Sequence, residues 1–279
     1  MTTAPLLRLD GVSRRFGGLV AVRELDMTVT AGAIHGLIGP NGAGKSTAFD
    51  LVSGLTRVSA GTVHFDGRDV TAAPAERRVA AGICRTFQTP RLFEAMTALE
   101  TVMTGCHRTS RCGFLASILS VRGKAADEAA IRRRAHDLLA LVGLERAADT
   151  PVSQLSYGPR RLVEIARALA TGPKLLLLDE VASGLNPVET QFVADLVRTL
   201  AADGLTVVLV EHDMRFILGI CERVTVLNFG TRIADGTPAE IVADPAVIAA
   251  YLGEARPDAA SRRDLRHAAR AAAPQDLPS

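Results

Sequence analysis

The segment 39–47 reads Gly-Pro-Asn-Gly-Ala-Gly-Lys-Ser-Thr and matches the phosphate-binding pattern G-x-x-x-x-G-K-[ST]. Gly42 and Gly44 allow the backbone to curl, so that successive N–H groups point into one concavity, to which a following helix adds its positive end. In such a loop Lys45 reaches the β- and γ-phosphates of a nucleotide, and Ser46 places its hydroxyl on Mg²⁺. A plain glycine-rich turn is the alternative, and the complete motif between a strand and a helix disfavours it. The residues predicted to surround the phosphates are Gly39, Pro40, Asn41, Gly42, Ala43, Gly44, Lys45, Ser46 and Thr47.

A pair of carboxylates, Asp179 and Glu180, follows the four leucines at 175–178. The leucines predict a buried strand, and the carboxyl end of such a strand is where ligands collect in open α/β sheets. There Asp179 would hold Mg²⁺ through water, and Glu180 could be the general base that polarises the water attacking the γ-phosphate. Helix capping by one of the two carboxylates is the alternative, and it applies more readily to Glu180 than to Asp179.

The elements that position these residues follow from the pattern of apolar residues. Apolar strands that alternate with helices indicate a parallel sheet covered on both faces. The strands expected in this sheet are 33–38, 175–178, 206–210 and 223–227, and the expected helices are 45–53 and 188–200. Near the start of the chain, alternation predicts antiparallel strands at 6–10 and 25–29, and Asp66-Gly67 predicts the turn of a hairpin between 62–65 and 68–70.

Composition excludes several classes of protein. The 279 residues carry 32 Lys and Arg against 30 Asp and Glu, a formal net charge of +2, which disfavours a protein that coats nucleic acid. No apolar run reaches the ~18 residues of a membrane-spanning helix, and the first residues do not read as a secretory leader, so we expect a cytosolic chain. Cysteine spacing shows no C-x-x-C pair, which predicts reduced thiols and no zinc site at Cys84, Cys106, Cys112 or Cys221.

A further loop motif indicates which phosphate-binding family is involved. Leu-Ser-Tyr-Gly-Pro at 155–159 lies shortly before the acidic strand. Together with the phosphate loop and the acidic pair, it resembles the ABC-type ATPases, the nucleotide-binding subunits of ATP-driven transporters, whose signature loop is usually written LSGGQ. The resemblance implies that Phe16 stacks on adenine, that Gln88 senses Mg²⁺ and the membrane partner, and that His212 contacts the γ-phosphate. Taken singly, Phe16 would more often be a core residue, Gln88 a solvated loop residue, and His212 a histidine hydrogen-bonded at the end of a strand.

In this family two copies pack head to tail, and the signature of one closes on the nucleotide held by the other. Ser156 and Gly158 would therefore complete the opposite site. Ser156 is well placed as the N-cap of the next helix, whose free N–H groups would attract a phosphate. Pro159 stands where the family commonly has Gln, and it contributes neither an N–H nor an amide side chain, although the first turn of a helix tolerates it. Val181 and Asn186 replace a common Pro and Asp.

The fold implied by the resemblance is α/β: a P-loop ATPase core with a mixed sheet, an amino-terminal antiparallel β subdomain and an inserted α-helical subdomain. We expect one ABC-type nucleotide-binding domain over residues 1–253, with the helical subdomain at roughly 92–172. The segment 254–279 is rich in Ala, Arg, Asp and Pro, which predicts a flexible tail.

Four stretches resemble the ATPase subunits of branched-chain amino acid importers in particular: 16–22, 85–88, 211–214 and 250–253, together with an extra segment at 106–124. This resemblance implies ATP and Mg²⁺ as cofactors and a peripheral position on the cytoplasmic face of the membrane. The implied partners are transmembrane permease subunits that dock near Gln88 and residues 91–96, a second ATPase subunit of the same or another sequence, and indirectly a periplasmic or extracellular solute-binding protein.

Other functions remain as alternatives. Urea importers and the lipopolysaccharide-export ATPase carry closely similar motifs. An ABC ATPase acting on DNA or the ribosome is disfavoured by the single ATPase copy and by the short distance between Gln88 and Leu155, so no nucleic acid partner is expected. A purely regulatory nucleotide binder would be expected to lose Glu180 or His212, and both are present.

Overall fold

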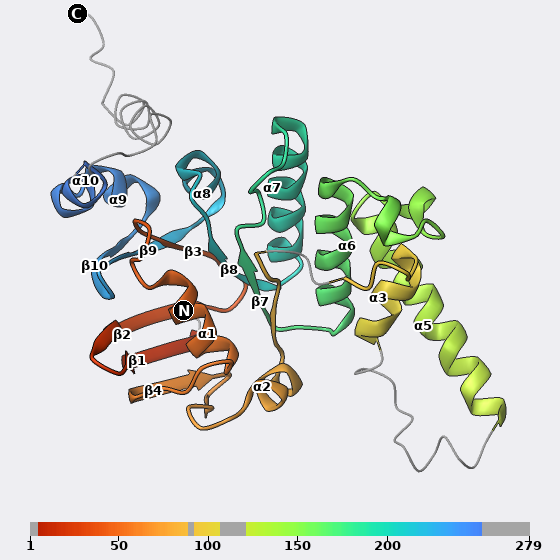
Figure 1. Cartoon of the computed structure of the whole chain (residues 1–279), viewed down its shortest axis with the longest axis horizontal. Helices are drawn as coiled ribbons and strands as arrows, with labels where there is room; N and C mark the ends of the chain where they lie inside the picture. Colours follow the sequence, from red (N-terminus) through yellow and green to blue (C-terminus); the bar gives the residue numbers. More distant parts are fainter. Residues whose placement is uncertain (1–4, 89–91, 107–120, 253–279) are drawn as a thin grey trace, which may run out of the picture.

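The computed structural model describes residues 5–88, 92–106 and 121–252 of the chain. The predicted tail, and residues 107–120 of the predicted extra segment, lie outside these ranges. Two lobes are visible: both sheets lie in one, and α3, α5 and α6 form the other (Figure 1). The strands are β1 (Pro5–Phe16), β2 (Leu19–Thr30), β3 (Ile34–Ile38), β4 (Ala60–Phe65), β5 (Arg68–Asp69), β6 (Ile83–Arg85), β7 (Leu175–Asp179), β8 (Thr206–Val210), β9 (Arg223–Asn228) and β10 (Thr231–Gly236). The α-helices are α1 (Lys45–Ser53), α2 (Ala75–Ala81), α3 (Ala98–Cys106), α5 (Val121–Leu141), α6 (Tyr157–Ala170), α7 (Pro187–Ala202), α8 (Met214–Ile220), α9 (Pro238–Ala243) and α10 (Pro245–Leu252).

The smaller sheet is antiparallel and has the order β2-β1-β4-β5. This confirms the strands expected near the start of the chain, although β1 and β2 are each 12 residues long. Register shifts between β1 and β2 interrupt the alternation on which the sequence prediction relied, which is why the predicted strands were too short. The predicted hairpin turn is present, with positive φ angles at Asp66 (51°) and Gly67 (72°).

The larger sheet has the order β10-β9-β3-β8-β7-β6 and is parallel from β9 to β6. β10 pairs with β9 in the antiparallel sense, so the sheet is mixed, as predicted. Successive side chains of a strand point to opposite faces. Leu175 and Leu177 accordingly pack in the cluster that includes β1, β2 and α1, whereas Leu176 and Leu178 pack in the cluster that includes α3, α6 and α7. The predicted covering of both faces is confirmed, and the second sheet provides part of one cover.

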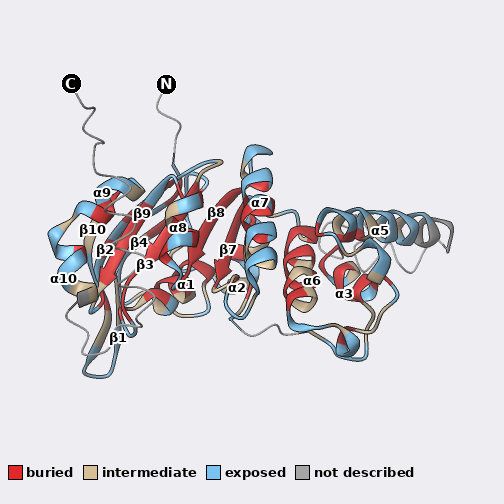
Figure 2. Cartoon of the chain, turned by 90° about the horizontal axis from the view of Figure 1, so that it is seen from above, coloured by how far each residue is buried: buried red, intermediate tan, exposed pale blue. Residues whose placement is uncertain are grey.

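The helical lobe lies within the predicted range 92–172, and its helices α3, α5 and α6 contact one another. Figure 2 shows it beside the sheets, with the buried side of α6 turned toward α3 and α5. Ser156 is the N-cap residue of α6, as predicted, but its side chain makes no capping hydrogen bond. Pro159 lies in the first turn of this helix, where the missing N–H disrupts no helical hydrogen bond.

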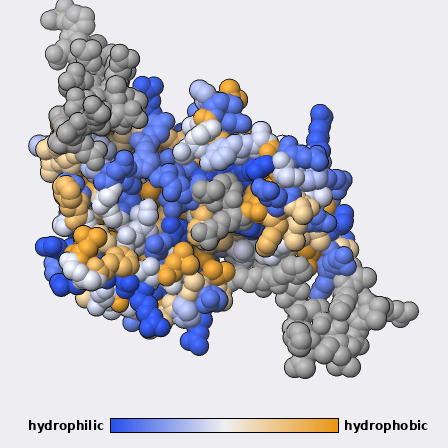
Figure 3. All heavy atoms as spheres, in the orientation of Figure 1, coloured by the Kyte–Doolittle hydropathy of each residue, from blue (hydrophilic) through white to orange (hydrophobic). Residues whose placement is uncertain are grey.

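The surface mixes polar and apolar side chains. On the face shown in Figure 3, hydrophilic residues spread over both lobes and hydrophobic residues form small groups between them. Within the described ranges, no helix combines the length and the apolar character that crossing a bilayer requires. Within the part of the chain that the structure describes, Cys84, Cys106 and Cys221 form no disulfide, and Cys112 is outside the described residues.

Candidate nucleotide-binding site

The phosphate-binding motif forms the loop between β3 and the start of α1, as predicted. Two positions of the loop require glycine, because the backbone of a neighbouring strand lies too close to leave room for a side chain. A Cβ on Gly39 would lie 2.1 Å from the Leu227 carbonyl oxygen, and one on Gly44 would lie 2.5 Å from the Ala21 carbonyl oxygen. Both residues also have positive φ, 150° and 99°. The loop is therefore pressed between β9 and β2, and a side chain at either position would force it out of place.

Lys45 lies buried inside this loop. Its Nζ donates hydrogen bonds to the carbonyl oxygens of Gly39 (2.6 Å) and Pro40 (2.9 Å). Gly44 is the N-cap of α1 and has no side chain that could cap the helix, so the first N–H groups of α1 need an acceptor from outside the helix. A buried ammonium together with a helix N-terminus forms a cradle that fits an anion such as a phosphate.

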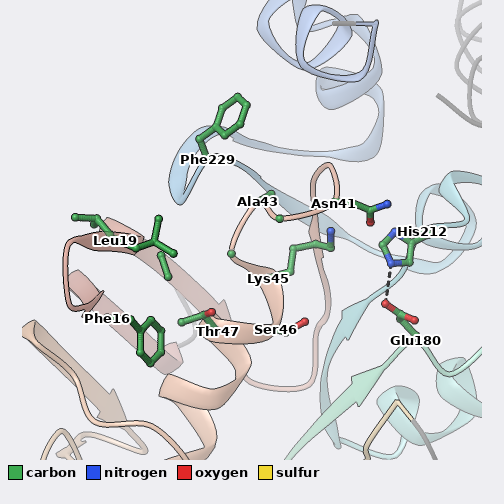
Figure 4. A pocket seen from close by; sticks show the side chains of 14 residues that line it. Phe16, Leu19, Asn41, Ala43, Lys45, Ser46, Thr47, Glu180, His212 and Phe229 are labelled. Carbon is green, nitrogen blue, oxygen red and sulfur yellow. Dashed lines mark hydrogen bonds and ion pairs between the residues drawn. The ribbon is translucent and has the colours of Figure 1, made fainter. Parts of the chain in front are cut away.

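A pocket of about 480 Å³ opens over the loop. In Figure 4, Phe16 and Leu19 lie at one side of the phosphate loop, whereas Glu180 and His212 lie at the other. The Phe16 ring is 45% exposed, and the guanidinium carbon of Arg14 lies 4.3 Å from its centroid. This exposed ring offers a flat apolar surface for a base. The residues that line the pocket are Phe16, Leu19, Val20, Ala21, Asn41, Gly42, Ala43, Gly44, Lys45, Ser46, Thr47, Glu180, His212 and Phe229.

Glu180 joins two of the residues singled out from the sequence. One carboxylate oxygen lies 2.7 Å from His212 Nε2, and the other accepts a hydrogen bond from Gln88 Nε2 at 2.5 Å. The three side chains come from loops that follow β7, β8 and β6, at the same edge of the sheet. Glu180 also has a left-handed backbone, with φ of 49°, a conformation that costs a residue other than glycine of order 1 kcal/mol. Neighbouring residues therefore hold this carboxylate in one place.

Asp179 is buried and paired with Arg85. Its Oδ2 accepts a hydrogen bond of 2.7 Å from one guanidinium nitrogen, and Asp50 Oδ1 accepts one of 2.5 Å from another. Oxygen ligands suit Mg²⁺, and the hydroxyl of Ser46, the amide oxygen of Gln88 and the carboxylate of Asp179 are groups of that kind. Of the three residues, Ser46 lines the pocket, whereas Gln88 bonds Glu180 and Asp179 bonds Arg85. Among the described residues no group of three or more His, Cys, Asp or Glu is placed to hold a metal ion. A Mg²⁺ here would thus depend on hydroxyl, amide and phosphate oxygens as well.

Arg161, near the start of α6, connects the two lobes. Its guanidinium donates hydrogen bonds to the backbone carbonyls of Gln88 (2.8 Å), Glu180 (2.7 Å), Asp179 (3.3 Å) and Phe87, and it pairs with the Glu164 carboxylate at 3.0 Å. Glu164 in turn accepts a hydrogen bond of 3.1 Å from the Phe87 N–H. Both side chains are buried. Two charged residues of α6 therefore anchor the segments that carry Gln88 and Glu180.

Glu211 is a second buried carboxylate beside the proposed base. It accepts hydrogen bonds from the backbone N–H groups of Ala182 (2.6 Å) and His212 (3.3 Å). Burial raises the pKa of Glu211 to about 7, against the lowering effect of these two hydrogen bonds. Glu211 thereby links the loop after β7 with the loop after β8.

Ser156 and Gly158 do not line the pocket. They begin α6 in the helical lobe, away from the phosphate loop (Figure 1). Ser156 is exposed, whereas Gly158 is buried against the carboxylate of Glu189. Within one chain the structure thus brings together the phosphate loop, Phe16, Glu180, His212 and, through Glu180, Gln88, but leaves the residues of the predicted signature apart from them.

Comparison with known proteins decides the family. The model of the ABC transporter family matches residues 22–183, which is more than half of the chain. The chain belongs to the ABC transporter family of ATP-binding proteins. A second model, described as branched-chain amino acid ATP-binding cassette transporter, matches residues 231–256.

Individual ABC proteins resemble the chain over most of its length. The high-affinity branched-chain amino acid transport ATP-binding protein BraF of Pseudomonas aeruginosa is 39% identical over 252 residues, which are 90% of this chain and 99% of BraF. The lipopolysaccharide export system ATP-binding protein LptB of Acidithiobacillus ferridurans is 36% identical over 249 residues, 89% of this chain and 97% of LptB. The crystal structure of an ABC transporter cassette in its ADP conformation is 30% identical, with a TM-score of 0.78, and covers 90% of this chain and 100% of that one.

Sequence reasoning assigned no role to several residues of this ABC cassette that support the site. Arg85 was noted only as part of a motif, and Arg161, Glu164 and Glu211 were given no role. The available signal was their charge: Arg161 and Glu164 interrupt a helix face that is otherwise apolar, and Glu211 directly follows the four apolar residues 207–210 of β8. Buried charges in such positions need partners, which marks them as candidates for structural or functional contacts.

Proposed function

We propose that this chain is the ATP-hydrolysing subunit of an ABC importer for branched-chain or chemically similar amino acids. The observation that carries the proposal is the carboxylate of Glu180, which Gln88 and His212 hold at one side of the pocket above the phosphate loop. The resemblance to BraF and the family match at 231–256 support the amino acid substrate class. The similarity to LptB supports lipopolysaccharide export as the second candidate, and urea import is a third expected from motifs alone.

Each residue of the pocket then has a chemical role in hydrolysis. The loop N–H groups and Lys45 bind the phosphates, and Phe16 stacks on the adenine. Glu180 takes the proton of the attacking water, and the imidazole of His212, which donates from Nε2 to Glu180, orients that carboxylate and contacts the γ-phosphate. Ser46, Gln88 and Asp179 would hold Mg²⁺, and that ion would supply positive charge against the phosphate oxygens.

The separation of the signature from the pocket supports a dimer. Ser156 and Gly158 reach a nucleotide only if a second cassette, of the same or another sequence, presents them. Transmembrane permease subunits would dock beside Gln88 and residues 91–96. Arg91 lies outside the described residues, and Phe93 is 63% exposed. The chain would then lie peripherally on the cytoplasmic face of the membrane. A solute-binding protein would act through the permeases, without contacting this subunit.

The base assignment is tested with purified Glu180→Gln protein. Its near-isosteric amide cannot accept a proton, so hydrolysis should fall at least 100-fold while ATP binding persists and a closed dimer accumulates. Hydrolysis at the wild-type rate would refute the assignment. Size-exclusion chromatography with and without ATP detects the dimer.

The substrate class is tested by transport in cells. Deletion of this subunit should abolish uptake of labelled leucine and leave urea uptake unchanged, and the wild-type gene, but not a Glu180→Gln copy, should restore it. Normal leucine uptake in the deletion strain would reject the amino acid assignment. A defect confined to the export of lipopolysaccharide would favour the second candidate.

A further inference from the structure

The carboxylate of Glu189, in the first turn of α7, packs against the first turn of α6. A Cβ built on Gly158 would lie 2.3 Å from Glu189 Oε1, so this oxygen rests on the bare Cα of the glycine. Glu189 Oε2 accepts a hydrogen bond of 3.0 Å from the backbone N–H of Asn186, and Asn186 Oδ1 accepts one of 3.0 Å from the backbone N–H of Glu189. This reciprocal capping box fixes where the carboxylate lies.

The first turn of α6 is electropositive and has no acidic residue of its own. Its leading N–H groups lack intrahelical acceptors, and the side chain of Ser156 makes no capping bond to them. A negative charge beside such a helix end is stabilising. Glu189 supplies that charge from the neighbouring helix, so in the isolated subunit the contact favours α6.

The same charge acts in the opposite direction when a nucleotide arrives. We propose that Glu189 lowers the affinity of the composite site for ATP by holding a negative charge against the signature segment 155–159. The inference rests on the proposed function, in which Ser156 and Gly158 receive the γ-phosphate bound by a second cassette. The carboxylate and that phosphate are like charges at one helix end, and the capping box keeps the carboxylate from moving away. Glu189 therefore raises the ATP concentration at which the dimer closes.

Glu189→Gln separates charge from structure, because glutamine at this position of a capping box makes the same backbone hydrogen bond. In a Glu180→Gln background, which traps the closed dimer, light scattering measures the ATP concentration that gives half-maximal dimer. We expect this concentration to fall about fivefold at low salt, the effect of removing one like-charge contact at about 4 Å in a water-like medium. The difference should shrink in ~0.5 M NaCl. Without nucleotide, the Tm should fall by about 1–3 °C.

Glu240→Gln is the matched control. Glu240 occupies the same position of a capping box in α9, with Thr237 as N-cap, and its carboxylate also packs on a glycine, Gly236. In Figure 1, α9 lies on the opposite side of the molecule from α6. This variant removes an identical charge and should leave the half-maximal ATP concentration unchanged.

The outcomes distinguish the inference from the proposal on which it rests. If the Glu180→Gln protein dimerises but Glu189→Gln leaves its half-maximal ATP concentration unchanged or raises it, the inference is overturned and the proposed function stands. A contact that is merely structural can only be weakened by the substitution, so it would not lower this concentration. If the Glu180→Gln protein forms no dimer at any ATP concentration, the proposed function fails, and the inference fails with it. A fall of the same size for Glu240→Gln would also overturn it, since net charge would then be the cause.

Discussion

Replacing Arg161 by leucine should destabilise the chain strongly, because the change leaves a buried carboxylate without its ion pair. The Arg161 side chain is 0% exposed, and that of its partner Glu164 is 1% exposed. Breaking a buried ion pair by removal of one partner costs about 3–5 kcal/mol. The carbonyls of Phe87, Gln88, Asp179 and Glu180 lose a donor at the same time, which places the cost at the upper end of that range.

Urea denaturation followed by circular dichroism measures this loss. In thermal unfolding, a loss of about 3–5 kcal/mol in the free energy of unfolding corresponds, for a chain of this size, to a fall in Tm of roughly 6–20 °C. Arg160→Leu is the control on the same helix. Arg160 is partly exposed, bonds the nearby carbonyls of Ser153 and Leu155, and pairs at 4.0 Å with the exposed carboxylate of Glu94, so its loss should stay within about 1 kcal/mol. The double variant Arg161→Leu/Glu164→Leu should regain part of the stability, since no charge is left buried alone. A loss below about 1 kcal/mol for Arg161→Leu, with an unchanged m-value, would refute the reasoning.

Three further predictions concern the site. Lys45→Ala should abolish tight ATP binding, because the buried ammonium is lost from the loop; wild-type affinity in a fluorescent-nucleotide titration would contradict this. His212→Ala should reduce hydrolysis at least tenfold and ATP binding much less, and equal losses in the two assays would argue against its contact with Glu180. Burial raises the pKa of Glu211 to about 7 in the folded chain, above the 4.5 of an unburied glutamate, so Glu211 binds its proton more tightly in the folded chain than in the unfolded one. The resulting stabilisation is complete below pH ~4.5 and is lost as the pH rises to ~7, so Glu211→Gln should remove a decline of about 3 kcal/mol from the pH profile of unfolding without nucleotide. Parallel profiles for the two proteins would show the pKa of Glu211 to be unshifted.

Local elements that depend on a few consecutive residues could be predicted from the sequence. The phosphate loop, the leucine strand β7 and the Asp66-Gly67 turn each depend on a short pattern, and the structure contains all three. The spacing of Gln88, Glu180 and His212 does not by itself bring them together. They were grouped by the family resemblance, and the geometry then showed Glu180 between the other two.

Contacts between distant segments could not be predicted in the same way. Arg85 meets Asp50 and Asp179, 35 and 94 positions away, and no local pattern encodes such a pairing. The anchoring by Arg161 depends on how the helical lobe packs on the sheet, which hydrophobic periodicity leaves undetermined. The lengths of β1 and β2 were missed for a related reason, because register shifts disturb the alternation without ending the strands.

The bonds of Arg161 also have a mechanical consequence. The guanidinium of Arg161, on the helical lobe, is hydrogen-bonded directly to the peptide groups that flank Glu180, so a displacement of this lobe would be transmitted to them. A force on that lobe would therefore act beside the carboxylate that would activate water. Movement of the helical lobe and hydrolysis would thus be coupled at the Arg161 guanidinium.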